Sequence, residues 1–126
     1  TLAKKVLDKN GIPYIDFGTY IKKDCDYNEY VIAAVDSIRN KTCDFGMGFC
    51  RTGQGINILA NHLDGIRSAL VMDKYTAEYA LRHNCVNFFS IPEKYVSEDT
   101  LDNMVKIWKE TTFDGGRHMT RMKHIM

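Results

Sequence analysis

The sequence predicts an α/β fold in which helices cover both faces of a doubly wound parallel sheet. Short apolar runs of strand length alternate along the chain with longer segments whose apolar residues recur at helical spacing. The apolar runs are nearly unbroken, as is typical of parallel strands that are buried on both faces. No repeat, low-complexity stretch or linker divides the 126 residues, so we expect one domain over 1–126.

The first half of the chain predicts helices and strands in alternation. The pair Asn10-Gly11 is a common helix end, and the run CDFGMGFC is too short and too rich in glycine for a helix. The expected elements are a short helix that Asn10-Gly11 ends, a strand at 13–17, a helix at 27–39 and a strand at 43–50. The chain opens on the pattern of the second half of a helix, so we expect a preceding strand and loop outside this sequence.

The second half continues the alternation. Residues 52–55 (TGQG) predict a turn, after which the apolar residues return to helical spacing. Ser97 is a common N-cap residue, and the acidic residues that follow it favour the positive end of a helix. The expected elements are a helix after the turn, a strand at 67–72, a helix at 74–82, a strand at 86–91, a helix after Ser97 and a short tail rich in Arg and Met.

The charge balance and the hydropathy pattern exclude two classes of partner. The chain has 17 Lys plus Arg against 16 Asp plus Glu and a net charge of +1, without the basic excess that a nucleic-acid binder usually has. No apolar run approaches the ~18 residues that a membrane-spanning helix needs. We therefore expect neither a nucleic acid nor a membrane as a partner.

The four cysteines do not have the spacing of a metal site. Cys25, Cys43, Cys50 and Cys85 form no C-x-x-C pair, and no histidine lies at zinc-finger spacing from them. Scattered cysteines of this kind are typical of reduced thiols in a cytoplasmic protein. We expect no bound metal, and we expect Cys25, Cys43 and Cys85 to be small buried residues.

One segment combines the features of a reactive site. Residues 49–55 (FCRTGQG) follow a predicted strand and open a helix, and ligands of open α/β sheets bind beyond the carboxyl ends of the strands. The helix N-terminus favours an anion and also the thiolate form of Cys50. The alternative is a tight strand–helix turn with a buried cysteine. Neither nucleotide motif is present, because G-x-x-x-x-G-K-[ST] is absent and Ile58 stands where a third glycine is required.

Several short motifs occur in one order along nearly the whole chain: DFGT at 16–19, YNEY at 27–30, CRTGQG at 50–55, Ala60-Asn61, GIRSAL at 65–70, His83-Asn84, and GGRH at 115–118 with Arg121. In this order and spacing they resemble the ribose-5-phosphate isomerase B family, which also contains the galactose-6-phosphate and allose-6-phosphate isomerases. The resemblance implies a three-layer Rossmann/flavodoxin-like fold and a cytoplasmic enzyme without cofactor or metal. It also implies a phosphorylated sugar as substrate and a homodimer with shared active sites, in some members paired again into a tetramer.

The reaction that the resemblance implies is the interconversion of ribose 5-phosphate and ribulose 5-phosphate, a step of the pentose phosphate pathway, through an enediolate. Cys50 matches the base that moves the proton, and Thr52 matches the threonine that assists proton movement between the two oxygens. The backbone N–H groups from Gly53 to Gly55 would stabilise the enediolate. His83 matches the histidine that opens the sugar ring across a dimer interface. The further substrate-binding residues that the resemblance implies are Asn61, Asn84, Lys94, Arg117 and Arg121, and Arg51 is a candidate because it lies directly beside Cys50.

Local chemistry alone leaves plainer interpretations of these residues open. A histidine at a helix end, such as His83, is often a C-terminal cap, and Asn61 could simply cap its own helix. Arg117 and Arg121 are four residues apart, so on a helical turn they face the same way and could bind one phosphate. The same pair is also typical of a solvated basic tail.

Three residues depart from the family pattern. Arg51 replaces the first glycine of the family's Cys-Gly-Thr-Gly motif, Lys94 stands where the family has a phosphate-binding arginine, and Asn28 replaces a proline. The family's first strand, with its Asp-His-Ala-Gly loop, lies outside this sequence. These departures leave open an isomerase of allose 6-phosphate or galactose 6-phosphate, and a non-catalytic phosphosugar-binding paralogue. A flavin or nucleotide module is disfavoured because no phosphate loop matches.

Overall fold

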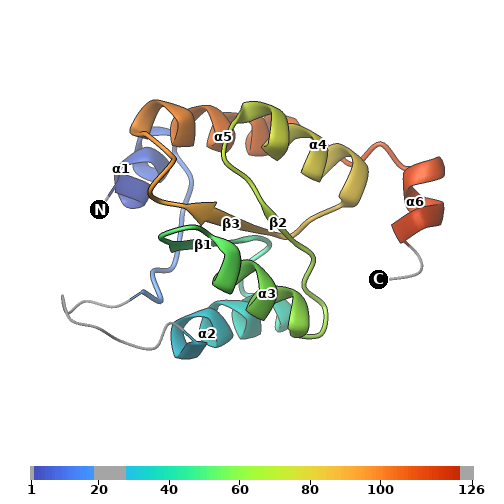
Figure 1. Cartoon of the computed structure of the whole chain (residues 1–126), viewed down its shortest axis with the longest axis horizontal. Coiled ribbons are helices and arrows are strands. Elements are labelled where there is room, and N and C mark those ends of the chain that lie inside the picture. Colours follow the sequence, from blue (N-terminus) through green and yellow to red (C-terminus); the bar gives the residue numbers. More distant parts are fainter. Residues whose placement is uncertain (1, 19–27, 123–126) are drawn as a thin grey trace.

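A computed structural model describes residues 2–18 and 28–122 of the chain. Helices and strands alternate through most of the described residues, as the sequence predicts (Figure 1). In chain order the elements are α1 (Leu2–Lys9), α2 (Asn28–Arg39), β1 (Gly46–Cys50), α3 (Gln54–His62), β2 (Ser68–Leu70), α4 (Lys74–Asn84), β3 (Phe88–Pro92), α5 (Glu98–Glu110) and α6 (Arg117–Met122).

The described strands form one parallel sheet in the order β1-β3-β2. Phe88 of β3 aligns with Gly46 of β1 on one side and with Ser68 of β2 on the other. In Figure 1 the helices α1, α4 and α5 lie above the sheet, while α2 and α3 lie below it. The arrangement confirms the three-layer, doubly wound α/β fold, and it brings the carboxyl ends of all these strands to one edge.

The central strand β3 explains why the layers hold together. All its residues are buried, and its side chains alternate between two apolar clusters. Phe89 and Ile91 pack among residues of α1, α4 and α5, whereas Phe88 packs among residues of α2 and α3. Since burying one such side chain contributes about 1.5–3 kcal/mol, β3 helps to stabilise both layers.

The glycine-rich sequence of β1 lets helix α3 approach the sheet closely. A Cβ atom on Gly48 would lie 2.7 Å from Cγ2 of Ile56 and 3.1 Å from the ring of Phe88. Such distances are far shorter than ordinary carbon–carbon contacts. Gly48 therefore allows the short distance between β1 and the helix that follows it.

A polar cluster joins α1 to α5 on the other face. The Asn10 side chain donates to Oδ1 of Asp102 at 2.8 Å, and Nζ of Lys106 lies 2.8 Å from Oδ2 of the same carboxylate. The hydrogen bonds from Lys106 and Asn10 lower the pKa of Asp102. The carboxylate therefore stabilises the fold above its ordinary pKa, and this contribution is lost as the pH falls through the lowered value.

The structure corrects two expectations from the sequence. Residues 13–17 do not form a strand, because within the described ranges no neighbouring strand pairs with them, and a strand needs such a neighbour. Cys43 and Cys85 are half-buried rather than fully buried, and Cys25 lies outside the described residues. The other predicted helices and strands agree with the structure to within a few residues at their ends, and part of the expected tail forms helix α6. No helix of the described part is long and apolar enough to cross a membrane.

Candidate active site

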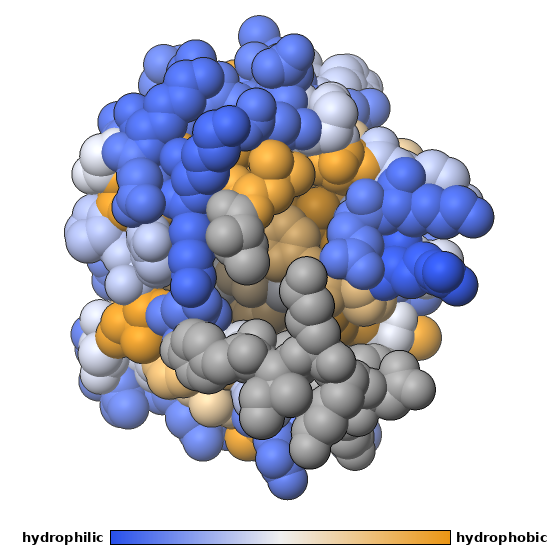
Figure 2. All heavy atoms as spheres, turned by 90° about the vertical axis from the view of Figure 1, so that its left-hand side faces the viewer, coloured by the Kyte–Doolittle hydropathy of each residue, from blue (hydrophilic) through white to orange (hydrophobic). Residues whose placement is uncertain are grey.

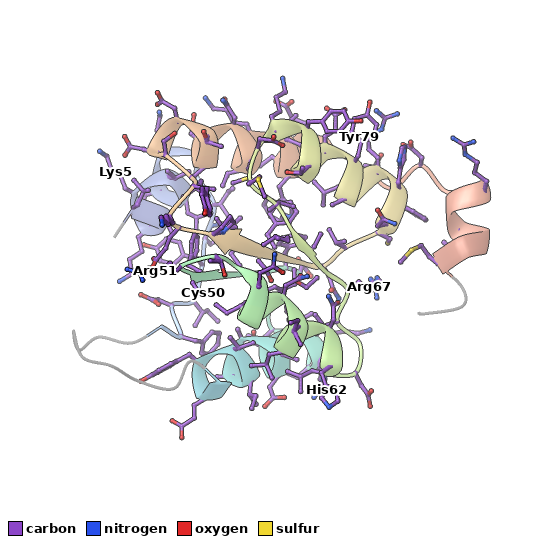
Figure 3. All side chains as sticks on the ribbon, in the orientation of Figure 1. Lys5, Cys50, Arg51, His62, Arg67 and Tyr79 are labelled. Atoms are coloured by element: carbon purple, nitrogen blue, oxygen red, sulfur yellow. The ribbon has the colours of Figure 1, made fainter. Side chains whose placement is uncertain are left out.

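Cys50 is the last residue of β1 and lies at the carboxyl edge of the sheet. Its side chain packs, half-buried, against the apolar cluster formed with α2 and α3. Figure 3 places Cys50 and Arg51 together at this end of β1. Figure 2 views the molecule from this side and shows a hollow with a hydrophobic floor and hydrophilic residues to its left and right. The thiol therefore has one side on the core and another toward the edge where ligands of such sheets bind.

The turn after Cys50 leads directly into the N-terminus of α3. Gly53 has a φ of 78°, which favours glycine, and its carbonyl accepts the N–H of Asn57 at 3.1 Å. A side chain at Gly53 would also collide with Leu70 of β2 and lie 3.2 Å from the backbone nitrogen of Pro92. No side chain caps the helix at Gly53, although Oγ1 of Thr52 lies 3.5 Å from the Gln54 nitrogen. The N–H groups of this first turn are thus suited to an anionic oxygen.

The loop after β3 lies alongside Cys50 and Arg51. The Glu93 N–H donates to the Cys50 carbonyl at 2.9 Å, and the Lys94 N–H donates to the Arg51 carbonyl at 3.2 Å. These bonds extend the pairing of β1 and β3 beyond the strand ends. They fix two exposed cationic residues, Arg51 and Lys94, close to the cysteine.

His83 and Asn84 lie at the opposite edge of the sheet. Helix α4 starts after the carboxyl end of β2 and runs back, so its last residues lie where β3 begins, and Figure 1 shows α6 beside this end. The Asn84 side-chain nitrogen lies 3.9 Å from the sulfur of Met122 in α6. Within one chain, therefore, the structure does not bring His83 and Asn84 to Cys50.

Arg117 opens α6 near the same end, and its side chain is exposed. The position of Arg121 falls within α6, but its side chain lies outside what the structure describes. The backbone spacing of the two residues is that of successive helical turns. The expectation that both arginines face one phosphate thus remains a prediction.

Asn61 has a structural contact that the sequence did not indicate. Its side-chain nitrogen donates to the Ser68 carbonyl at 2.9 Å, and its oxygen accepts the Ser68 N–H at 2.7 Å. Both ends of the amide therefore join α3 to β2. This contact competes with the substrate-binding role that the sequence suggested for Asn61.

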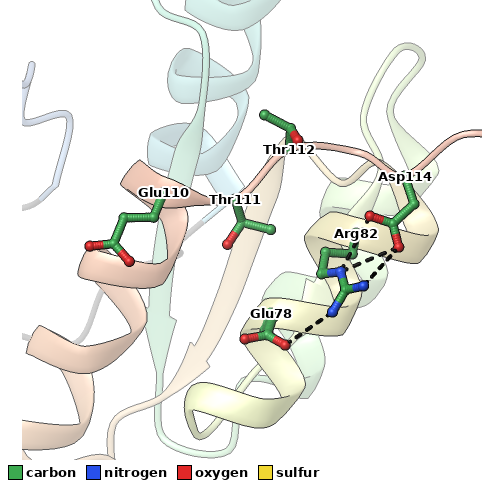
Figure 4. A pocket seen from close by; sticks show the side chains of 6 residues that line it. All are labelled: Glu78, Arg82, Glu110, Thr111, Thr112 and Asp114. Carbon is green, nitrogen blue, oxygen red and sulfur yellow. Dashed lines mark hydrogen bonds and ion pairs between the residues drawn. The ribbon is translucent and has the colours of Figure 1, made fainter.

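Sequence reasoning also missed a charged cluster between α4 and the segment that follows α5. Arg82 contacts Glu78 at 3.4 Å and Asp114 at 3.2 Å, and Asp114 raises the pKa of the guanidinium (Figure 4). These side chains line a hollow of about 260 Å³ with Glu110, Thr111 and Thr112. No signal in the sequence could have paired Asp114 with α4, because the two lie far apart along the chain.

No metal site is evident in the part of the chain that the structure describes. Over residues 2–18 and 28–122, no group of three or more His, Cys, Asp or Glu side chains is arranged to hold an ion.

The sequence matches the model of the family described as Ribose/Galactose Isomerase over residues 1–125. The chain belongs to this family. It is 30% identical to the ribose-5-phosphate isomerase B of Escherichia coli (strain K12), with 94% of this chain and 80% of that protein covered. As a Ribose/Galactose Isomerase family member, the chain is a sugar-phosphate isomerase.

Solved structures show the same family relationship. A ribose 5-phosphate isomerase from Thermotoga maritima has a TM-score of 0.93 at 36% identity, covering 98% of this chain and 86% of that one. The ribose-5-phosphate isomerase B of Mycoplasma genitalium, solved with bound ribulose-5-phosphate, has a TM-score of 0.89 at 27% identity, covering 98% and 83%. These matches to solved members of the Ribose/Galactose Isomerase family confirm the Rossmann/flavodoxin-like fold expected from the sequence.

Proposed function

We propose that this isomerase interconverts ribose 5-phosphate and ribulose 5-phosphate with Cys50 as its catalytic base. The main support is the position of Cys50 at the carboxyl end of β1, next to a helix N-terminus that no side chain caps. Two further observations support the substrate. The similar Escherichia coli and Thermotoga maritima proteins are ribose-5-phosphate isomerases, and the Mycoplasma genitalium structure holds ribulose-5-phosphate.

The proposed reaction is a proton transfer between neighbouring carbons. The Cys50 thiolate removes the proton from C2 of the open-chain aldose, and the electron pair moves toward O1 to form an enediolate. Thr52 assists the proton movement between O1 and O2, and Cys50 returns its proton to C1, which yields the ketose. The N–H groups from Gly53 to Gly55 stabilise the developing negative charge, an effect of about 3 kcal/mol per donor in comparable sites.

The residues at the opposite edge of the sheet contribute to the active site of a second copy of the chain. His83 lies at the end of α4 remote from Cys50, so ring opening by this residue requires a homodimer with shared active sites. In such a dimer Lys94 of one copy and Asn84, Arg117 and Arg121 of the other surround the phosphate. Cations from two chains would then bind one dianion by charge-assisted hydrogen bonds.

Arg51 supports a second candidate substrate. Its exposed side chain stands directly beside Cys50 and Lys94, where an added cation changes the space and charge around the sugar. An isomerase of allose 6-phosphate or galactose 6-phosphate is therefore the alternative within the same reaction. A non-catalytic phosphosugar-binding protein is the alternative outside it.

The test is conversion of ribose 5-phosphate by the wild type and by Cys50→Ala, with Cys85→Ala as a matched control, since both cysteines are half-buried free thiols. Loss of a catalytic base lowers turnover by about 10²–10⁴-fold, so we expect a loss of that size for Cys50→Ala alone. Turnover of a six-carbon phosphosugar in place of ribose 5-phosphate would transfer the assignment to that substrate. Binding without turnover of any of them would reject catalysis.

A further inference from the structure

The imidazole of His83 is contacted on two sides. Its Nε2 lies 3.7 Å from Oδ2 of Asp114, and its ring centroid lies 4.9 Å from that of Tyr79, one helical turn earlier, at an angle of 61°. Tyr79 is itself covered by the Arg82 guanidinium, 5.2 Å from its ring centroid. A carboxylate and an aromatic ring together thus restrict the orientation of the imidazole.

Asp114 is in turn held by Arg82. The Arg82 Nε lies 3.3 Å from each carboxylate oxygen, and Nη2 lies 3.2 Å from Oδ2 (Figure 4). The backbone N–H of Asp114 also donates to the Arg82 carbonyl at 2.9 Å. Glu78 contacts the other side of the guanidinium at 3.4 Å. The carboxylate is therefore fixed by a side-chain and a backbone contact, with Oδ2 directed at His83.

We propose that Asp114 is the positioning residue for His83. The Asp114 carboxylate lies 3.7 Å from Nε2 and, together with the Tyr79 ring, limits the directions in which the imidazole can point. In the ring-opening step the imidazole takes the proton of the anomeric hydroxyl and passes it to the ring oxygen, while the C1–O4 bond breaks and its electron pair goes to O4. This inference rests on the proposed function, which gives His83 the ring-opening step.

Two assays separate ring opening from enediolate chemistry. Conversion of ribose 5-phosphate requires the furanose ring to open. Exchange of a C1 hydrogen of ribulose 5-phosphate with heavy water requires only the enediolate step, because this ketose has its O5 phosphorylated and stays acyclic. A positioning residue for His83 should therefore affect the first assay and not the second.

We expect Asp114→Ala to lower ribose 5-phosphate turnover about fivefold, the scale of one exposed ion pair, and to leave the C1 exchange rate unchanged. In a His83→Ala background the same substitution should cause no further loss, since residues that act through one another are not additive. Glu78→Gln, which removes a carboxylate from the same guanidinium without contacting His83, should change neither assay. Asp114→Asn is a milder change than Asp114→Ala, because it removes the negative charge but keeps a side-chain oxygen that can accept a hydrogen bond.

Equal losses in both assays, an added loss in the His83→Ala background, or no loss in the wild-type background would each overturn the positioning role. A readout independent of activity is the ¹⁵N chemical shift of the His83 ring, which should move in Asp114→Ala and not in Glu78→Gln. Unchanged His83 shifts in Asp114→Ala would also overturn the proposal. Absence of C1 exchange in the wild type would instead reject the proposed function, which keeps the two failures distinct.

Discussion

The two edges of the sheet hold their candidate functional residues by different means. At the carboxyl edge Cys50, Arg51 and Lys94 are placed by the backbone, because β1 ends there and the loop after β3 donates N–H groups to both carbonyls. At the opposite edge His83 is placed by side chains, through the Asp114 carboxylate and the Tyr79 ring. The positions at the carboxyl edge therefore follow from the backbone fold itself, whereas the position of His83 depends on additional side-chain contacts.

This difference indicates which changes each edge tolerates. Residues that are positioned by the backbone should keep their position when an exposed side chain is exchanged, but not when a glycine that the turn requires is replaced. A residue that is positioned by a charged side chain, as His83 is, should instead lose its position when that charge is removed. The predictions below use this contrast, beginning with the largest expected effect.

The largest effect is expected when Cys50 and His83 are inactivated in different chains and the two variants are mixed. We expect Cys50→Ala and His83→Ala homodimers both to be nearly inactive. Mixed and re-equilibrated, they should regain roughly a quarter of the wild-type turnover, because half the dimers are then hybrids and each hybrid has one intact site. Turnover of ribose 5-phosphate after mixing measures this directly. No recovery, with hybrid formation verified by mass spectrometry, would contradict the shared site.

Gly53 and Gly65 offer a matched pair for the role of the backbone. Both have a φ near +80°, but a Cβ at Gly53 would collide with β2 and approach β3, whereas at Gly65 the nearest atom is 4.0 Å away. We expect Gly53→Ala to lower the free energy of unfolding by about 3 kcal/mol, from backbone strain plus overpacking, and Gly65→Ala by about 1 kcal/mol from strain alone. Urea denaturation checks both values. Equal losses would show that the packing at Gly53 is unimportant.

The cations beside Cys50 should affect binding without affecting stability. Lys94 is exposed, so we expect Lys94→Ala to raise KM for ribose 5-phosphate about tenfold while the free energy of unfolding changes by no more than about 0.5 kcal/mol. Glu93→Gln is the control, since Glu93 is the exposed neighbour whose N–H makes the equivalent backbone bond. Steady-state kinetics and urea denaturation on the same samples decide the matter. An unchanged KM in Lys94→Ala would show that Lys94 does not bind the phosphate. The KM of Arg51→Ala would then show whether Arg51 is the phosphate-binding cation beside Cys50.

The carboxyl edge could be predicted from the sequence because its determinants are local. The strand ending at Cys50, the turn at 52–55 and the following helix lie within a few residues of one another, and their patterns are distinct. Lys94 was assigned to the substrate site only through the family resemblance, and the structure shows its position beside Cys50 in the bonds between the 93–94 backbone and residues 50–51.

The opposite edge could not be predicted in the same way. Asp114, Arg82 and His83 meet because α5 returns the chain to the end of α4, and no sequence pattern reports such a meeting. The strand expected at 13–17 failed for a related reason, since apolar content predicts a strand but only a neighbouring strand creates one. Asn61 was assigned to the site from its motif, while its partner in the structure is the backbone of a later strand.

The contact between Asn61 and Ser68 bears on how the protein behaves at high concentration. Strand β2 lies at one edge of the described sheet, and its neighbours Arg67 and Val71 make backbone bonds toward β3, so the N–H and carbonyl of Ser68 face outward. Exposed strand edges are templates on which other molecules add strands and aggregate. By occupying both groups, the Asn61 side chain takes the place that an added strand would use at this point of the edge.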